Sequence, residues 1–140
     1  MARQTILTIE TTGPGLYEFT DKVQAFVGGE TTGSALLTMF VRHTSCSIIM
    51  QENADPDVQR DLAAFLNRLV PDAEDSAMSY LRHCSEGPDD MPAHIKAALT
   101  QTSIGIPVAD GRMMLGTWQG IYLWEHRTTP HRREVVLHIS

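Results

Sequence analysis

Three histidines in separate segments, His43, His83 and His94, are the residues of this chain best suited to chemistry. Imidazole titrates near neutral pH, so each is able to serve as an acid, a base or a metal ligand. The chain has no short zinc motif, and a metal site must therefore be assembled from three segments. Three imidazoles that leave a position for water suit a catalytic transition metal. Without a metal, the same residues suit acid–base chemistry and phosphate binding.

The first histidine lies two residues after the apolar run 35–41 and precedes two hydroxyl residues, Thr44 and Ser45. We treat these two as candidate substrate contacts. Glu52 follows closely, and its carboxylate is a candidate for general acid–base work or for orienting an imidazole. A histidine that is merely hydrogen-bonded at the end of a strand explains the position of His43 equally well, so both interpretations stay open.

The second and third histidines lie on either side of a turn at Gly87-Pro88 and two carboxylates, Asp89 and Asp90. Asp90 is a candidate substrate-binding residue, although capping of the next helix is a competing role for either carboxylate. We expect His94 in the first helical turn. There the helix dipole lowers the pKa of an imidazole and favours its neutral, metal-binding form.

A glycine-bracketed segment, 116–120, supplies the remaining polar candidates. Gln119 lies within it and Glu125 follows it, and both are candidates for polar contacts to a ligand. Trp118 could stack on a ring, although a large aromatic residue is more often part of a core or an interface. The glycines let the backbone approach a ligand closely, or simply allow a β-bulge.

The elements that must position these residues follow from hydrophobic periodicity. A helix is predicted from a cap at Thr20 to Val27, ended by Gly28-Gly29. A second is capped by Asp55 and reaches Leu69. A third runs from near Pro92 to Leu99, capped by Asp89 or Asp90. Apolar patterns predict strands over 5–11, 35–41, 104–108, 112–115, 121–125 and 134–139, with a tight turn at Asp110-Gly111. The prediction is one α+β domain, 1–140, with a mostly antiparallel sheet or sandwich and two or three inserted helices.

Composition excludes several classes of function. The net charge of −6 argues against duplex DNA or an anionic membrane as the main partner, because both need concentrated lysine and arginine. No apolar run approaches the roughly 18 residues of a membrane span. The two cysteines match no zinc or redox spacing, and we expect no signal peptide before the first strand. Free thiols in a reducing cytoplasm are the expectation.

Four segments together resemble a known family. They are 43–47 (His-Thr-Ser-Cys-Ser), 52–56 (Glu-Asn-Ala-Asp-Pro), 82–94, and 115–121 (Leu-Gly-Thr-Trp-Gln-Gly-Ile) with Glu125. In this order, over nearly the whole chain, they are similar to the YjbQ-like family, which is associated with secondary thiamine-phosphate synthase activity. One motif alone is weak, but the four together are specific. The family often has another small residue in place of Cys46, which argues against shared thiol chemistry.

The resemblance implies an α+β domain that forms a homotrimer, with a polar site near a subunit boundary. The positions that match the family's functional-looking residues are His43, Glu52, His83, His94, Gln119 and Glu125. The implied reaction joins a pyrimidine methyl diphosphate to a thiazole phosphate and releases pyrophosphate, with a divalent metal, magnesium or zinc, as a possible cofactor. Two alternatives stay open: a metal-dependent hydrolase of a small ester or phosphate, and a non-catalytic trimer that binds a metabolite.

Overall fold

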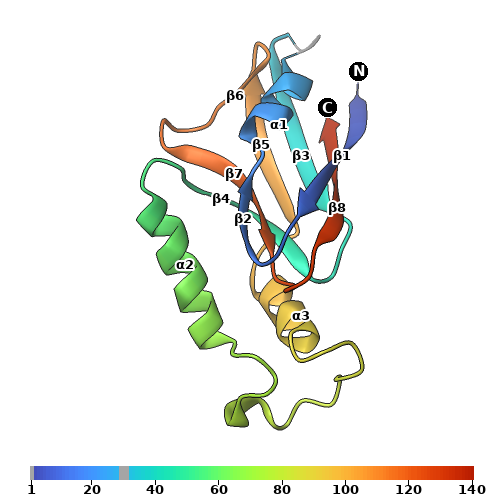
Figure 1. Ribbon diagram of the computed structural model, residues 1–140. Helices are drawn as coiled ribbons and strands as arrows, with labels where there is room; N and C mark the ends of the chain where they lie inside the picture. Colours follow the sequence, from blue (N-terminus) through green and yellow to red (C-terminus); the bar gives the residue numbers. More distant parts are fainter. Residues whose placement is uncertain (1, 29–31) are drawn as a thin grey trace.

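The computed structural model describes residues 2–28 and 32–140. This part of the chain forms two antiparallel sheets with three α-helices, so the predicted α+β class is confirmed (Figure 1). One sheet has the order β1-β8-β3-β5-β6 and the other β2-β7-β4. The strands are β1 (Arg3–Thr11), β2 (Gly15–Glu18), β3 (Ser34–Val41), β4 (Cys46–Glu52), β5 (Ser103–Ala109), β6 (Arg112–Met113), β7 (Gln119–Glu125) and β8 (His131–Ile139). The helices are α1 (Thr20–Val27), α2 (Pro56–Leu69) and α3 (Asp90–Leu99), with a short 3-10 turn, η1 (Ser76–Met78).

The main core lies between the two sheets. Strand β3 shows why: Leu37, Met39 and Val41 point inward and are at most 2% exposed, while the alternate residues face outward. Strand β7 is buried along almost its whole length because both of its faces are covered. Leu123 belongs to the main core, whereas Trp124 packs with Leu66 of α2 in a second, smaller cluster.

The helix predictions hold in part. Helix α2 begins as expected, because the Asp55 side chain accepts a hydrogen bond from the Asp57 amide. The predicted cap at Thr20 is wrong: Phe19 holds that position without a side-chain cap. The Thr20 hydroxyl instead donates to Glu18 and accepts from the Ile121 amide, so it links α1 to β7. The helix ends before Gly28, as predicted, and Gly29 lies outside the described residues.

The start of α3 differs from the prediction in a way that matters for the site. The helix begins at Asp90 rather than near Pro92, with Asp89 in the cap position. Neither carboxylate caps the helix. Asp89 accepts from Arg127 and from the Thr128 amide, and Asp90 is directed to other side chains. The expected capping role is therefore wrong, because charged partners on the β7–β8 connection compete for these oxygens.

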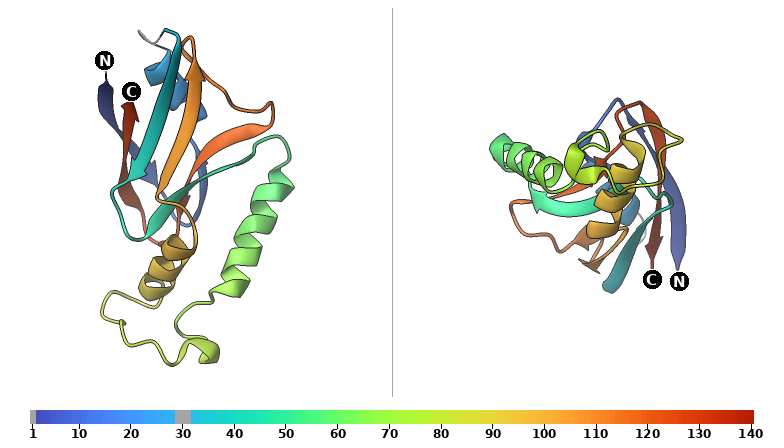
Figure 2. Two further views of the ribbon diagram at one scale, coloured as in Figure 1. Left: turned by 180° about the vertical axis from the view of Figure 1, so that it is seen from behind. Right: turned by 90° about the horizontal axis from the view of Figure 1, so that it is seen from below.

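Two strand predictions need correction. Strand β4 was missed, because its polar residues obscure the pattern, yet it pairs with β7 from Cys46↔Glu125 to Glu52↔Gln119. The hairpin at Asp110-Gly111 is confirmed, and both residues have positive φ, but the following strand ends at Met113. The two chain termini lie at the end of the sheets away from α3 (Figure 2). In the described ranges, no helix has the length and apolar character needed to cross a membrane.

Candidate functional site

A cluster of two imidazoles and two carboxylates forms at the start of α3. Its members are His83, Glu86, Asp90 and His94, and their ligand atoms all lie within 4.8 Å of one another. Asp90 is the centre, only 2% exposed. Its Oδ2 lies 2.7 Å from His83 Nε2 and 3.2 Å from His94 Nε2. We call these four residues the α3 cluster.

Local structure explains why the four residues meet. Asp90 and His94 are four residues apart on α3, so they share one face of the helix. Gly87 has a φ of 103°, a conformation that favours glycine, and the turn there brings His83 and Glu86 back over the helix start. His83 Nε2 lies 3.4 Å from Glu86 Oε2.

The orientation of His94 is fixed from the neighbouring strand connection. Its Nδ1 lies 2.9 Å from the Thr44 carbonyl oxygen, which can only accept, so Nδ1 carries a hydrogen. Nε2 is then the nitrogen that faces Asp90. A backbone carbonyl that fixes one imidazole nitrogen while the other faces a carboxylate is an arrangement typical of metal-binding histidines.

Arg127 holds the Asp90 carboxylate and the turn before α3 in place. Its Nη1 donates to Asp90 Oδ1 at 2.8 Å, its Nε donates to Asp89 at 2.8 Å, and its Nη2 donates to the Glu86 carbonyl. Burial by itself would raise the pKa of Asp90, but hydrogen bonding to His83 and the charges of His94 and Arg127 outweigh it and lower that pKa. Asp90 is therefore an anion at neutral pH.

The donor set of the α3 cluster fits a divalent transition metal. Two ligands of a tetrahedral zinc ion lie about 3.3 Å apart when each is about 2.0–2.1 Å from the metal. The His94–Asp90 and His83–Glu86 contacts, at 3.2 and 3.4 Å, match this spacing. The His83–Asp90 contact, at 2.7 Å, is a hydrogen-bond distance, so these two atoms would have to separate by about 0.6 Å. Two imidazole nitrogens favour zinc over magnesium, which prefers oxygen.

His43 lies outside this cluster within one chain. Its Nε2 accepts a 2.7 Å hydrogen bond from the Glu134 amide, and burial, together with the charge of Arg133, lowers its pKa. Nε2 is therefore occupied by the backbone of β8. The expected set of three histidines is brought together for His83 and His94 only, while His43 is adjacent to Thr44, whose carbonyl orients His94.

Glu125 and Ser45 belong to a separate, closed network. Glu125 is completely buried and accepts from the Thr11 hydroxyl, from Arg133 and from the amides of His126 and Arg127. Arg133 also donates to the Ser45 hydroxyl at 2.9 Å. These contacts leave Glu125 no free oxygen for a substrate, so the placement of both residues favours a structural role.

Glu52 and Gln119 lie at the other end of the same strand pair. They are register partners, six residues along β4 and β7 from the Cys46–Glu125 pair. At about 3.4 Å per residue, this separation is about 20 Å. Gln119 Oε1 accepts from the Gly116 amide, which closes the glycine-bracketed loop, and Trp118 within that loop is 63% exposed. One chain therefore does not bring Glu52 or Gln119 to the α3 cluster.

Two residues of the site were missed in the sequence. Glu86 had a usable signal, because the successive intervals His83–Glu86, Glu86–Asp90 and Asp90–His94 are three, four and four residues, which suits one helical turn and its preceding loop. Arg127 had none, since only the fold brings the β7–β8 connection against α3.

Comparison with known proteins places this chain in a family. The family model described as UPF0047 protein YjbQ-like matches residues 5–140. The chain belongs to this family. UPF0047 protein sll1880 of Synechocystis is 56% identical over 137 residues, covering 98% of this chain and 90% of that protein. UPF0047 protein YjbQ of Escherichia coli O157:H7 is 37% identical, covering 95% and 94%.

A solved structure from the same family agrees with the fold. It is a conserved protein of the YjbQ/UPF0047 family from Clostridium acetobutylicum, 33% identical, with a TM-score of 0.81 over 94% of this chain and 97% of the other. The matched region contains every residue of the α3 cluster. The YjbQ-like fold is thus common to the chain and this relative.

Proposed function

We propose that this YjbQ-like protein is an enzyme that uses a divalent metal, held by the α3 cluster, to act on a small phosphorylated substrate. The observation that carries the proposal is the arrangement around Asp90: a buried carboxylate whose one oxygen faces two partly exposed imidazoles. A purely structural carboxylate has no need of two imidazoles that reach solvent. The cluster has an open side, which a site for chemistry requires.

Each residue of the cluster has a defined task in this proposal. His83, Asp90 and His94 would hold the metal, with Glu86 as a fourth donor on the exposed side. When bound, the metal would supply positive charge that stabilises a phosphate or leaving pyrophosphate. Arg127 fixes the Asp90 carboxylate from behind and keeps it ionised. The Thr44 carbonyl holds the His94 ring, so its second nitrogen stays directed at the cluster.

Two reactions share this phosphate chemistry. The family resemblance favours the thiamine-phosphate synthase reaction, in which a pyrimidine methyl diphosphate is joined to a thiazole phosphate. The donor set supports metal-assisted hydrolysis of a small ester or phosphate as the second candidate, because two imidazoles suit zinc. A cytoplasmic site of action is part of the proposal and agrees with the free state of Cys46 and Cys84.

A homotrimer is also part of the proposal. The outer face of the larger sheet carries Ile6, Leu36 and Phe40, which are 45%, 48% and 49% exposed. Ile6 and Phe40 both pair with Val136 of β8, so an apolar stripe crosses three adjacent strands. Association of copies would cover this stripe.

The experiment combines metal analysis with a product assay. Purified protein is analysed for bound metal, then incubated with the pyrimidine diphosphate, with and without the thiazole phosphate, and products are identified by mass spectrometry. Thiamine phosphate with pyrophosphate indicates transfer, and the dephosphorylated pyrimidine indicates hydrolysis. His83→Ala and His94→Ala should each lose about 100-fold or more of either activity without loss of the fold.

His131→Ala is the matched control, because His131 is an imidazole on β8 whose ring, among the described residues, is hydrogen-bonded to the nearby Thr129 carbonyl and to no other group. Its activity should stay at the wild-type level. Turnover that survives in both cluster variants would reject the assignment of the site. Tight substrate binding with no product would instead identify a non-catalytic binding protein.

A further inference from the structure

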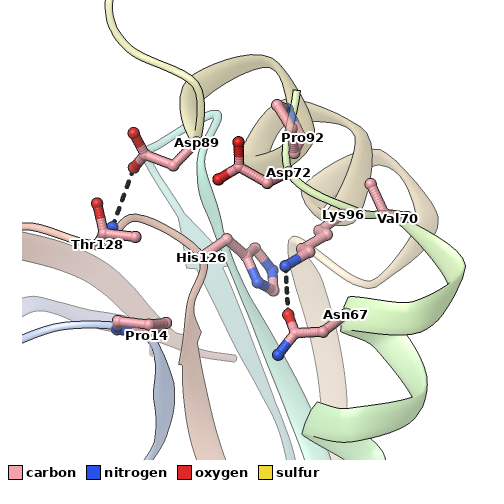
Figure 3. Close-up of a pocket in the computed structure, with 9 residues that line it drawn as sticks. All are labelled: Pro14, Asn67, Val70, Asp72, Asp89, Pro92, Lys96, His126 and Thr128. Atoms are coloured by element: carbon pink, nitrogen blue, oxygen red, sulfur yellow. Dashed lines mark hydrogen bonds between the residues drawn. The ribbon is translucent and has the colours of Figure 1, made fainter. Parts of the chain in front are cut away.

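A polar cavity lies where α2, α3 and the β7–β8 connection meet (Figure 3). It is lined by Pro92 and Lys96 of α3, and by no residue of the α3 cluster. Its volume is about 290 Å³, close to the lower limit for small-molecule sites. A smaller chamber of about 110 Å³ continues it toward Trp124 and shares several lining residues. We call the two together the Lys96 chamber. Its polar side chains include Asn67, Asp72, Lys96 and His126, and Pro14, Val70 and Pro92 supply apolar wall.

Lys96 projects from α3 into this chamber (Figure 3). Its Nζ donates one hydrogen bond, 2.6 Å long, to the neutral Asn67 Oδ1. In the described part of the chain, no carboxylate forms an ion pair with it. The two other hydrogens of the amine have no partner among the described residues, so a ligand in the chamber can accept them.

His126 offers a second position for a ligand. Its Nε2 lies 2.9 Å from the Ser47 hydroxyl, while its Nδ1 has no partner among the described residues. Every fully buried polar side-chain atom in those residues has a partner, so Nδ1 must reach open space, and His126 lines both parts of the chamber. Burial and the charge of Lys96 lower the pKa of His126 to about 3, which keeps the ring uncharged at neutral pH.

The charges of the chamber favour an uncharged ligand. Asp72 lines the cavity near Lys96, so the two opposite charges offset each other for a ligand between them (Figure 3). Asp89 is already paired with Arg127 and adds no free charge. An anion would meet the Asp72 carboxylate, and a cation would meet the Lys96 amine. A small molecule with a carbonyl group and hydroxyl groups matches the amine, the carboxylate and the free imidazole nitrogen.

We propose that the Lys96 chamber binds a small, uncharged hydroxycarbonyl compound, which Lys96 captures as an imine. In this step the amine nitrogen, after losing its extra proton to water, bonds to the carbonyl carbon, and the carbon–oxygen π pair moves to oxygen. A proton passes from the nitrogen to this oxygen, which becomes a hydroxyl. The hydroxyl takes back the proton first released to water and leaves as water, while the nitrogen lone pair forms the carbon–nitrogen double bond of the protonated imine. No oxidant or reductant is needed. This site goes beyond the proposed function, because none of its side chains belongs to the α3 cluster.

The chain contains its own control, because it has two lysines, Lys22 and Lys96. Lys22 is exposed on α1, and α1 lies at the end of the sheets opposite to α3 (Figure 1). The full-length protein is incubated with glycolaldehyde and cyanoborohydride, which reduces an imine to a stable amine. After digestion by a protease that does not cut at lysine, mass spectrometry gives the labelling rate at each lysine. Lys96 should be labelled about tenfold faster than Lys22.

The concentration dependence separates a binding site from simple reactivity. Labelling of Lys96 should saturate as glycolaldehyde increases, whereas labelling of Lys22 should rise linearly. The proposal is overturned if Lys96 is labelled no faster than Lys22, or if the labelling of Lys96 rises linearly with glycolaldehyde concentration. Glyoxylate, an aldehyde of similar size that carries a negative charge, should label Lys96 more slowly than glycolaldehyde. A preference for glyoxylate overturns the assignment of an uncharged ligand.

A pair of variants tests the chamber itself. Asn67→Tyr should obstruct the chamber while Lys96 remains, and saturation should be lost with Lys96 rates falling to those of Lys22. Arg68→Tyr is the matched control, since Arg68 is the next residue on α2 and does not line the chamber. Saturable labelling that persists in Asn67→Tyr overturns the assigned location. Circular dichroism of both variants verifies that they fold.

Discussion

Asp90 and Glu125 are two buried carboxylates with the same kind of partner and different surroundings. Asp90 is 2% exposed and accepts from Arg127, and Glu125 is fully buried and accepts from Arg133. Glu125 is then saturated by a hydroxyl and two backbone amides, all inside the protein. Asp90 instead directs its second oxygen to two imidazoles that reach solvent.

The difference separates a structural ion pair from a candidate site. A closed network satisfies all of its hydrogen bonds inside the protein, and it has no position left for a substrate or a metal. The α3 cluster keeps its arginine on the inside and its exchangeable groups on the outside. Burial and an arginine partner therefore do not identify a functional carboxylate. The exposure of its remaining partners is what makes Asp90 the candidate.

The largest effect on stability is expected at the closed network. Glu125→Gln removes the negative charge next to Arg133 and leaves a buried guanidinium without a counterion. The free energy of unfolding should fall by about 3–5 kcal/mol, measured by urea denaturation. Glu10→Gln, at the exposed pair with Arg132, is the control and should change it by less than about 1 kcal/mol. Similar losses in both variants would contradict the closed-network interpretation.

At the open site the main effect is on function. Asp90→Asn keeps the shape and an acceptor for Arg127 but removes the charge shared by His83 and His94. The free energy of unfolding should fall by only about 1–3 kcal/mol, while metal affinity, measured by zinc titration, should fall by about 100-fold. Unchanged metal affinity would remove the distinction between Asp90 and Glu125.

The pH dependence of stability tests the closed network further. Burial by itself would raise the pKa of Glu125, but hydrogen bonds from Arg133, Thr11 and the Arg127 amide outweigh it and lower that pKa in the folded protein. A lowered folded pKa gives stability that is present above the ordinary value of 4.5 and is lost as the pH falls through the folded value. The stability difference between wild type and Glu125→Gln should therefore be largest near neutral pH and shrink below pH 4.5. A constant difference would show that the carboxylate is not the cause.

The same two sites show how far sequence can predict this protein. His83, Asp90 and His94 were all identified as candidates, because a turn and a helix start place residues of nearby sequence together. Helix α2 and its Asp55 cap were predicted for the same local reason. Glu125 was also identified as a candidate, but for ligand binding. The sequence does not show that its carboxylate is occupied, because its partners Arg133 and Thr11 meet it only through the pairing of distant strands.

His43 and β4 show the limit of local patterns most clearly. Nε2 of His43 is occupied by the backbone amide of Glu134 on β8, 91 residues away in sequence, and this contact depends on the pairing of β3 with β8. Strand β4 carries Ser47 and Gln51 among its apolar residues, and it is recognisable only through its pairing with β7. The pairing register between strands decides which end of a strand reaches a site, and this register cannot be read from a single sequence.

The chain also has one cysteine near each of the two carboxylates. Their different reactivity gives the test with the smallest expected effect. Cys46 is the register partner of Glu125, and burial raises the pKa of its thiol to about 12. Cys84 is exposed and follows His83. Iodoacetamide at pH 8 should therefore label Cys84 and spare Cys46, because the thiolate is the reactive form. Added zinc should slow the labelling of Cys84 in wild type but not in Asp90→Asn. Equal slowing in both proteins would mean that zinc acts on the thiol directly, and the open site would lose its strongest solution test.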